Sequence, residues 1–97
     1  MVTIKVDVSD GIAPIPIRVF INHLENNEDD SKFSRDESFE ESFDLNGGKY
    51  SILVTGKNNP GSSTQISVSG ECLAGPVPSK PQKRVKPSYA VLFNLEV

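Results

Sequence analysis

Cysteine and histidine are nearly missing from this sequence and tryptophan is missing, which argues against zinc sites and against catalysis by a histidine- or cysteine-based arrangement. The chain of 97 residues contains one cysteine, one histidine and no tryptophan. Cys72 alone cannot form an intramolecular disulfide, and with His23 it supplies only two of the three or four nitrogen or sulfur ligands that zinc needs. His23 would also have to serve in any Ser-His-Asp or Cys-His arrangement, and the sequence contains no nucleophile motif to accompany it.

Carboxylates are plentiful, but they do not fit glycoside hydrolysis. That reaction needs two carboxyl groups at a set separation on rigid elements. Glu40 and Glu41 are adjacent, so on one strand their side chains point to opposite faces. Asp29 and Asp30 lie in a polar stretch, and the chain has no tryptophan to stack on a sugar. We therefore predict that the protein is not an enzyme.

Long apolar runs are also missing. No stretch approaches the roughly 18 apolar residues that a membrane-spanning helix needs. The first residues, MVTIKVDVSD, have neither the basic start nor the continuous apolar segment of a secretory signal. We expect a protein without a membrane span that stays in the cytoplasm or leaves by a leaderless route, unless a leader was removed in cloning.

The bulk composition is that of one folded domain. Hydrophobic residues make up 36% of the chain and charged residues 24%, which indicates a globular rather than a disordered chain. A chain of this length can bury one core, so we predict a single domain over residues 1–97.

Helical spacing of apolar residues is absent, whereas alternation of apolar and polar residues recurs along the chain. Six or seven short alternating segments predict an all-β fold, a small antiparallel β-sandwich, with an open barrel as second choice. The first and last segments, 2–8 and 89–97, alternate most regularly, so we expect them inside the sheets. Pro16 predicts an edge or a bulge where the second strand begins.

Gly47 and Gly48 stand between two alternating segments, in FDLNGGKYSILVTG. A loop that cradles phosphate would be followed by a helix, whose N-terminus holds the anion, but here a strand follows. The glycines therefore predict a hairpin turn, in which Asn46 and Gly47 would tolerate positive φ.

The same stretch resembles the Leu-x-x-Gly-x-Tyr-x-Ile-x-Val hairpin of transthyretin-like, carboxypeptidase-regulatory-like and related immunoglobulin-like modules. Leu45, Gly48, Tyr50, Ile52 and Val54 carry this resemblance. It implies that the tyrosine packs inside a sandwich and that the glycine makes the turn. It also implies a binding, spacer or assembly role, because such modules mostly have no catalytic activity.

Charge is strongly segregated along the chain. Residues 25–44 carry nine acids against two bases, a net of −7, whereas residues 76–87 carry four bases and no acid. We predict an acidic loop at about residues 25–38 and a basic, proline-rich loop at about residues 73–87. The four bases, which we predict to bind a protein partner or a second copy, are Lys80, Lys83, Arg84 and Lys86. Nucleic acid is a poor fit, because the chain is acidic overall and no aromatic residue is interleaved with the bases.

The acidic stretch ENNEDD leaves a second interpretation open. Calcium takes six to eight oxygen ligands, and Glu28, Asp29 and Asp30 are the candidates here, although their spacing does not match an EF-hand. The sequence thus predicts a non-catalytic protein-binding or assembly module without a cofactor. The alternative is a calcium-dependent module that binds carbohydrate or another surface.

Overall fold

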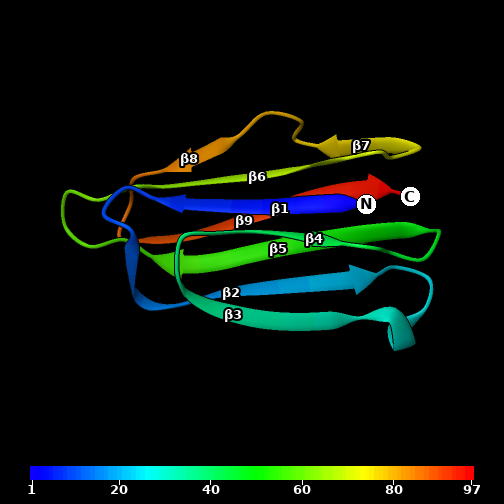
Figure 1. Cartoon of the computed structure of the whole chain (residues 1–97), viewed down its shortest axis with the longest axis horizontal. Coiled ribbons are helices and arrows are strands. Elements are labelled where there is room, and N and C mark those ends of the chain that lie inside the picture. The colour runs from blue at the N-terminus through cyan, green and yellow to red at the C-terminus, as the bar shows by residue number, and fades with distance from the viewer.

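Two antiparallel sheets packed face to face form the computed structural model, which describes residues 1–97 except for the side chain of Asp29. Within the described backbone the elements are β1 (Val2–Val8), β2 (Ile12–His23), the 3₁₀ turn η1 (Asn27–Asp29), β3 (Ser31–Glu37), β4 (Phe39–Phe43), β5 (Lys49–Lys57), β6 (Thr64–Gly70), β7 (Ala74–Val77), β8 (Gln82–Arg84) and β9 (Ser88–Glu96). One sheet has the order β4-β1-β6-β8 and the other β3-β2-β5-β9-β7 (Figure 1). The predicted β-sandwich is confirmed. No helix in the described chain is long and apolar enough to cross a membrane.

The core lies between the sheets and is built from the inward positions of the alternating strands. In β1 the side chains of Val2, Ile4, Val6 and Val8 are buried, while the intervening ones face outward. β6 of the same sheet adds Ile66 and Val68, and the central strands of the other sheet contribute further large side chains, among them Tyr50 at 1% exposure. As predicted, the terminal strands lie inside the sheets, β1 between β4 and β6 and β9 between β5 and β7.

The start of β2 is irregular, as its prolines predict. The pairing of β2 with β3 is shifted between Ile12 and Ile17, and Pro14 and Pro16 lie in this interval. A proline has no N–H to donate to the ladder, so the regular pairing resumes only at Ile17. From that residue on, alternate side chains of β2 are fully buried.

The glycine pair makes a turn, but the predicted hairpin is wrong. β4 belongs to the four-stranded sheet and β5 to the five-stranded sheet, so the chain crosses between the sheets at residues 44–48. Of this connection only Gly48 has a positive φ, 139°, and it exchanges two backbone hydrogen bonds with Val97, of 3.0 and 2.8 Å. Alternation on either side of a turn is the same whether the next strand is a neighbour or lies in the opposite sheet, so the sequence could not distinguish the two.

Parts of both predicted loops are strands, which raises the strand count above the predicted six or seven. Residues 31–37 of the acidic segment form β3, and the proline-rich segment contains β7 and β8. These three strands lie at sheet edges. An edge strand buries little of its surface, so it need not show the apolar alternation that identifies an interior strand.

Candidate protein-binding edges

The topology places the two charged segments at opposite sides of the sandwich. β3 and β4 stand first in their sheets, while β7 and β8 stand last (Figure 1). We call residues 31–44 the acidic edge and residues 74–87 the basic edge. At each edge the chain passes directly from one sheet to the other, so each charged segment borders both layers.

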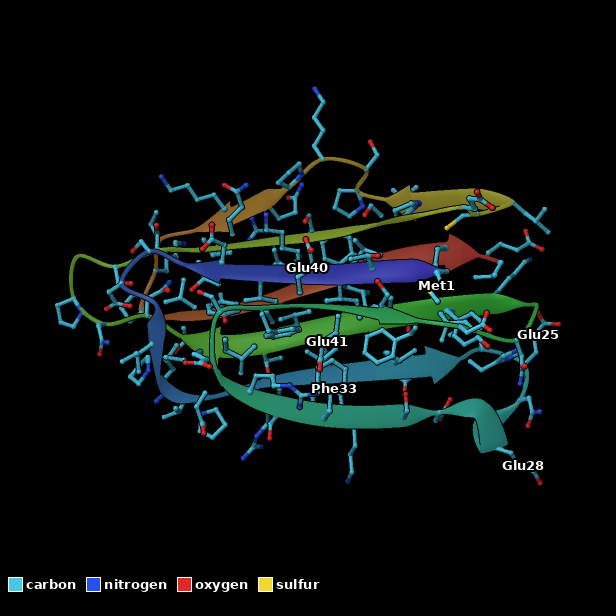
Figure 2. The ribbon with its side chains drawn as sticks, in the orientation of Figure 1. Met1, Glu25, Glu28, Phe33, Glu40 and Glu41 are labelled. Atoms are coloured by element: carbon cyan, nitrogen blue, oxygen red, sulfur yellow. The ribbon has the colours of Figure 1, made fainter. Side chains whose placement is uncertain are left out.

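Aromatic rings hold the acidic edge together. The Phe33 ring lies 5.7 Å from that of Phe39, edge to face, and 5.3 Å from that of Phe43, stacked. These contacts join β3 of one sheet to β4 of the other. The Arg35 guanidinium lies 4.8 Å from the centroid of Phe33 and 2.6 Å from Oε1 of Glu41, and Figure 2 shows Phe33 and Glu41 close together here.

Most acidic groups of this edge point into solvent. Glu41 is matched by Arg35, but its Oε2 is buried without a hydrogen-bond partner among the described residues. The other carboxylates of the edge are exposed and form no ion pair in the described part of the chain. Five acids against two bases give the edge a net charge of −3. The exposed carboxylates are those of Asp36, Glu37, Glu40 and Asp44.

The basic edge carries two of its charges on β8, at Lys83 and Arg84, and two in the flanking segments, and hydrogen bonds hold the backbone where β8 ends. Nδ2 of the buried Asn58 donates to the carbonyl oxygens of Arg84, at 3.1 Å, and Lys86, at 2.8 Å. The Thr64 hydroxyl donates to Oδ1 of Asn58 at 2.6 Å. The side chains of Lys80, Lys83 and Lys86 are exposed. Arg84 is half-buried, and none of the four predicted bases forms an ion pair within the described chain.

Sequence reasoning missed Asn58. It lies in KNNPGSS, which reads only as a turn. Nothing in that stretch identifies which of two adjacent asparagines turns inward, because its partners are backbone carbonyls about 26 and 28 residues away.

Two of the three predicted calcium ligands, Glu28 and Asp30, have described side chains. Glu28 is exposed in η1, and Oδ1 of Asp30 accepts a 2.7 Å hydrogen bond from the backbone N–H of His23. The side chain of Asp29 is outside the described residues. Among the described residues, no three His, Cys, Asp or Glu side chains are placed to hold a metal ion. Figure 2 shows Glu25 and Glu28 at the end of the molecule near η1, away from Glu40 and Glu41. Calcium binding stays a prediction.

His23 is an organising residue at the end of β2. Its Nδ1 accepts the backbone N–H groups of Glu25, at 3.1 Å, and Asn26, at 3.0 Å. We therefore assign the ring proton to Nε2, which donates to the carbonyl of Gly47 at 3.1 Å. The ring also packs edge-on against Tyr50, at 4.6 Å between centroids. Both nitrogens are thus used in tying two connections to the sandwich.

No protein-family model matches this chain, and no curated protein or solved structure matches it either. The resemblance of residues 43–56 to transthyretin-like modules therefore stays a prediction, although Tyr50 does pack inside the sandwich.

Proposed function

We propose that this protein is a non-catalytic binding or assembly module that contacts other proteins through its charged sheet edges. The observation that carries the proposal is the position of the charges, with exposed acids on one edge and exposed bases on the other. Exposed ion pairs within a chain contribute only about 0–1 kcal/mol each, so the fold loses little stability when its acids and bases lie on opposite edges and do not pair. Charge of one sign on a surface strip has a larger effect on the rate and orientation of association.

The basic edge is the better candidate for the contact. Asn58 holds its backbone at Arg84 and Lys86, so Lys83 projects from a defined strand. Exposed apolar side chains flank the bases, and such groups add binding energy when a partner covers them. These side chains are Leu73, Val77 and Val85. An acidic protein surface suits this combination. Nucleic acid suits it less, since the whole chain has a charge of −3 and the strip has no aromatic residue.

Sedimentation at two salt concentrations tests the proposal. Electrostatic association weakens as salt rises, since the Debye length falls from about 30 Å at 0.01 M to about 8 Å at 0.15 M. We expect the wild type to bind itself or an acidic probe protein at low salt and to lose that binding at moderate salt. Reversal of Lys80, Lys83, Arg84 and Lys86 to Glu should abolish binding and leave the melting temperature nearly unchanged.

The chain offers a matched control for this variant. Lys5, Arg18, Lys49 and Lys57 are also exposed, and they lie outside both charged segments. Their reversal to Glu changes the net charge by the same amount, so binding that survives it assigns the effect to the basic edge. Equal loss of binding in both variants would show that only total charge matters, and the proposal would fail.

The calcium-dependent alternative predicts a different result. A module that binds through calcium should melt at a higher temperature in millimolar calcium, because the ion binds only the folded state. Glu28→Gln with Asp29→Asn should then abolish the rise. We propose binding without calcium because the Asp30 carboxylate is already engaged by His23, and we expect no rise.

A further inference from the structure

We infer that the partner is a second copy of this chain, and that β4 of one copy pairs with β8 of the next so that the four-stranded sheet continues across the contact. This inference rests on the proposed function, which it makes specific.

Strand direction allows this pairing. β4 and β8 are separated by three antiparallel steps, β4 to β1, β1 to β6 and β6 to β8. Strands an odd number of antiparallel steps apart run in opposite directions. A second copy in the same orientation would therefore present β8 antiparallel to β4, and the sheet would continue in its own pattern.

The edges of the five-stranded sheet are less suited to pairing. β3 and β7 are four antiparallel steps apart, so copies in the same orientation would present them parallel, which is slightly less stable per residue. β7 also contains Pro76, which cannot donate to a new strand and protects the edge that it occupies. β4 and β8 contain no proline.

Charge selects a head-to-tail contact over a symmetric one. On the outer face Glu40 is exposed on β4 and Lys83 is exposed on β8, so the proposed contact brings opposite charges together. In a two-fold contact between β4 strands, Glu40 and the neighbouring acidic residues of one copy would face the same acidic residues of the other copy. A two-fold contact between β8 strands would do the same with the bases. Like charges in direct opposition destabilise a pair of strands.

The contact is open at both ends. Each copy would keep a free β4 or a free β8 after pairing, so further copies can add until the chain closes as a ring or grows as a filament. β8 has only three residues, and in Figure 1 β7 and β8 lie one after the other along the basic edge. Two copies must therefore be offset along the strands to centre β8 on β4. So short a pairing would be weak, which makes the association sensitive to concentration and salt.

Two charge-reversal variants test whether the partner is a second copy. Glu37→Lys with Glu40→Lys and Asp44→Lys makes both edges basic, while Lys80→Glu with Lys83→Glu and Lys86→Glu makes both edges acidic. In sedimentation at low salt the wild type should associate and each variant alone should stay monomeric. A mixture of the two variants should regain the association. Variants that self-associate alone, or a mixture that stays monomeric, would overturn the inference.

Cysteine cross-linking tests which strands meet. In a Cys72→Ser background, Ser42→Cys places a thiol on the outer face of β4 and Lys83→Cys places one on β8. Mild oxidation should give covalent dimers when the two proteins are mixed and few when either is oxidised alone. Ser51→Cys lies at an outward position of β5, the central strand of the five-stranded sheet, and gives the background level. Dimers at only that level in the mixture, or equal dimers from either protein alone, would exclude the β4–β8 contact.

Failure of this inference can be told from failure of the proposed function. Polyglutamate serves as an acidic probe that is not a copy of this chain. If the wild type binds it in a salt-dependent way and the variant with Lys80→Glu, Lys83→Glu and Lys86→Glu does not, the binding role stands even when self-association is not observed. Loss of both self-association and polyglutamate binding would remove the proposed function as well.

Discussion

The two edges of the sandwich are attached to it by different chemistry. At the acidic edge three phenylalanine rings pack together between the sheets, with Phe33 in contact with Phe39 and Phe43. At the basic edge no residue from 74 to 87 is in the buried core, and the backbone is held by the buried amide of Asn58. One attachment is apolar and the other is a set of directed hydrogen bonds.

This difference shows how charged strands can be fixed without neutralising their charges. Ring packing at the acidic edge uses the inward side chains and leaves the outward ones, such as Glu40, exposed. At the basic edge even the inward positions are only half-buried, so packing stabilises little, and carbonyl groups accept the anchoring hydrogen bonds instead. Because hydrogen bonds depend on direction and ring packing tolerates small shifts, the two edges should respond differently to substitution.

The largest effect is expected where the acidic edge leads into the five-stranded sheet, at Gly48. A Cβ atom there would clash with Nε2 of the His23 ring, and the φ of 139° is unfavourable for any side chain. Both effects act together, so Gly48→Val should lower the free energy of unfolding by about 2–4 kcal/mol, measured by urea denaturation. Gly47→Ala is the control, because its Cβ would meet only the Val97 carbonyl at 3.6 Å. Similar losses in both variants would refute the role given to the His23 contact.

Phe33→Ala should give the next largest effect and should loosen only the acidic edge. Truncation removes both ring contacts and the surface under Arg35. We expect a loss of about 2 kcal/mol in urea, less than the 3–5 kcal/mol typical of a fully buried Phe, because this ring is only partly buried. Val85→Ala at the basic edge should change stability by less than about 0.5 kcal/mol. Equal losses of stability in Phe33→Ala and Val85→Ala would contradict the proposed difference between the two attachments.

Asn58 offers the complementary test at the basic edge. Asn58→Ala leaves two carbonyls and the Thr64 hydroxyl without their partner, which should cost about 1–2 kcal/mol in urea. Asn58→Asp keeps the size but sets a carboxylate against the carbonyls of Arg84 and Lys86, so it should cost more than Ala. Hydrogen exchange should rise at residues 82–86 in both variants. An Asp variant as stable as the wild type would show that the amide is not the anchor.

The sandwich itself was predictable because its interior strands alternate. In β1, β5, β6 and β9 every second side chain is buried, and this pattern is visible without any knowledge of pairing. The edge strands were not predictable, since β3 contains one inward aromatic residue among polar ones and β7 is interrupted by proline. The crossing between sheets at Gly48 was hidden for a similar reason, because local sequence does not specify which strand the next one joins.

The candidate site was predictable in its charges and not in its geometry. Counting acids and bases identified both segments, including Lys83 and its three neighbours. Their placement on opposite sides follows from the sheet order, which is set by pairings between residues far apart in sequence. The anchors Asn58 and His23 were missed because both act on backbone groups of distant or irregular segments.

Tyr89 gives the smallest effect, and it is visible only in alkali. Its hydroxyl is buried close to that of Thr64 and has no hydrogen-bond partner among the described residues. Burial raises the pKa of Tyr89 above its usual value of about 10, an effect that the Thr64 hydroxyl partly offsets. Above about pH 10 the unfolded chain therefore loses the phenol proton while the folded chain keeps it, and stability falls as pH rises.

Tyr89→Phe lacks this ionisation. At pH 7–9 its unfolding midpoint in urea should be close to that of the wild type, because the lost hydroxyl made no hydrogen bond. Between about pH 9.5 and 11 the wild type should lose more stability than the variant, so the difference between the two midpoints should shift in favour of Phe. Both proteins contain the same lysines, so the effect of lysine titration cancels in the difference between the two midpoints. A constant difference over this range would mean that the phenol ionises as easily in the folded chain as in the unfolded one. Water would then reach the Tyr89 hydroxyl, and the Asn58–Thr64 anchor beside it would be less well buried than the structure shows.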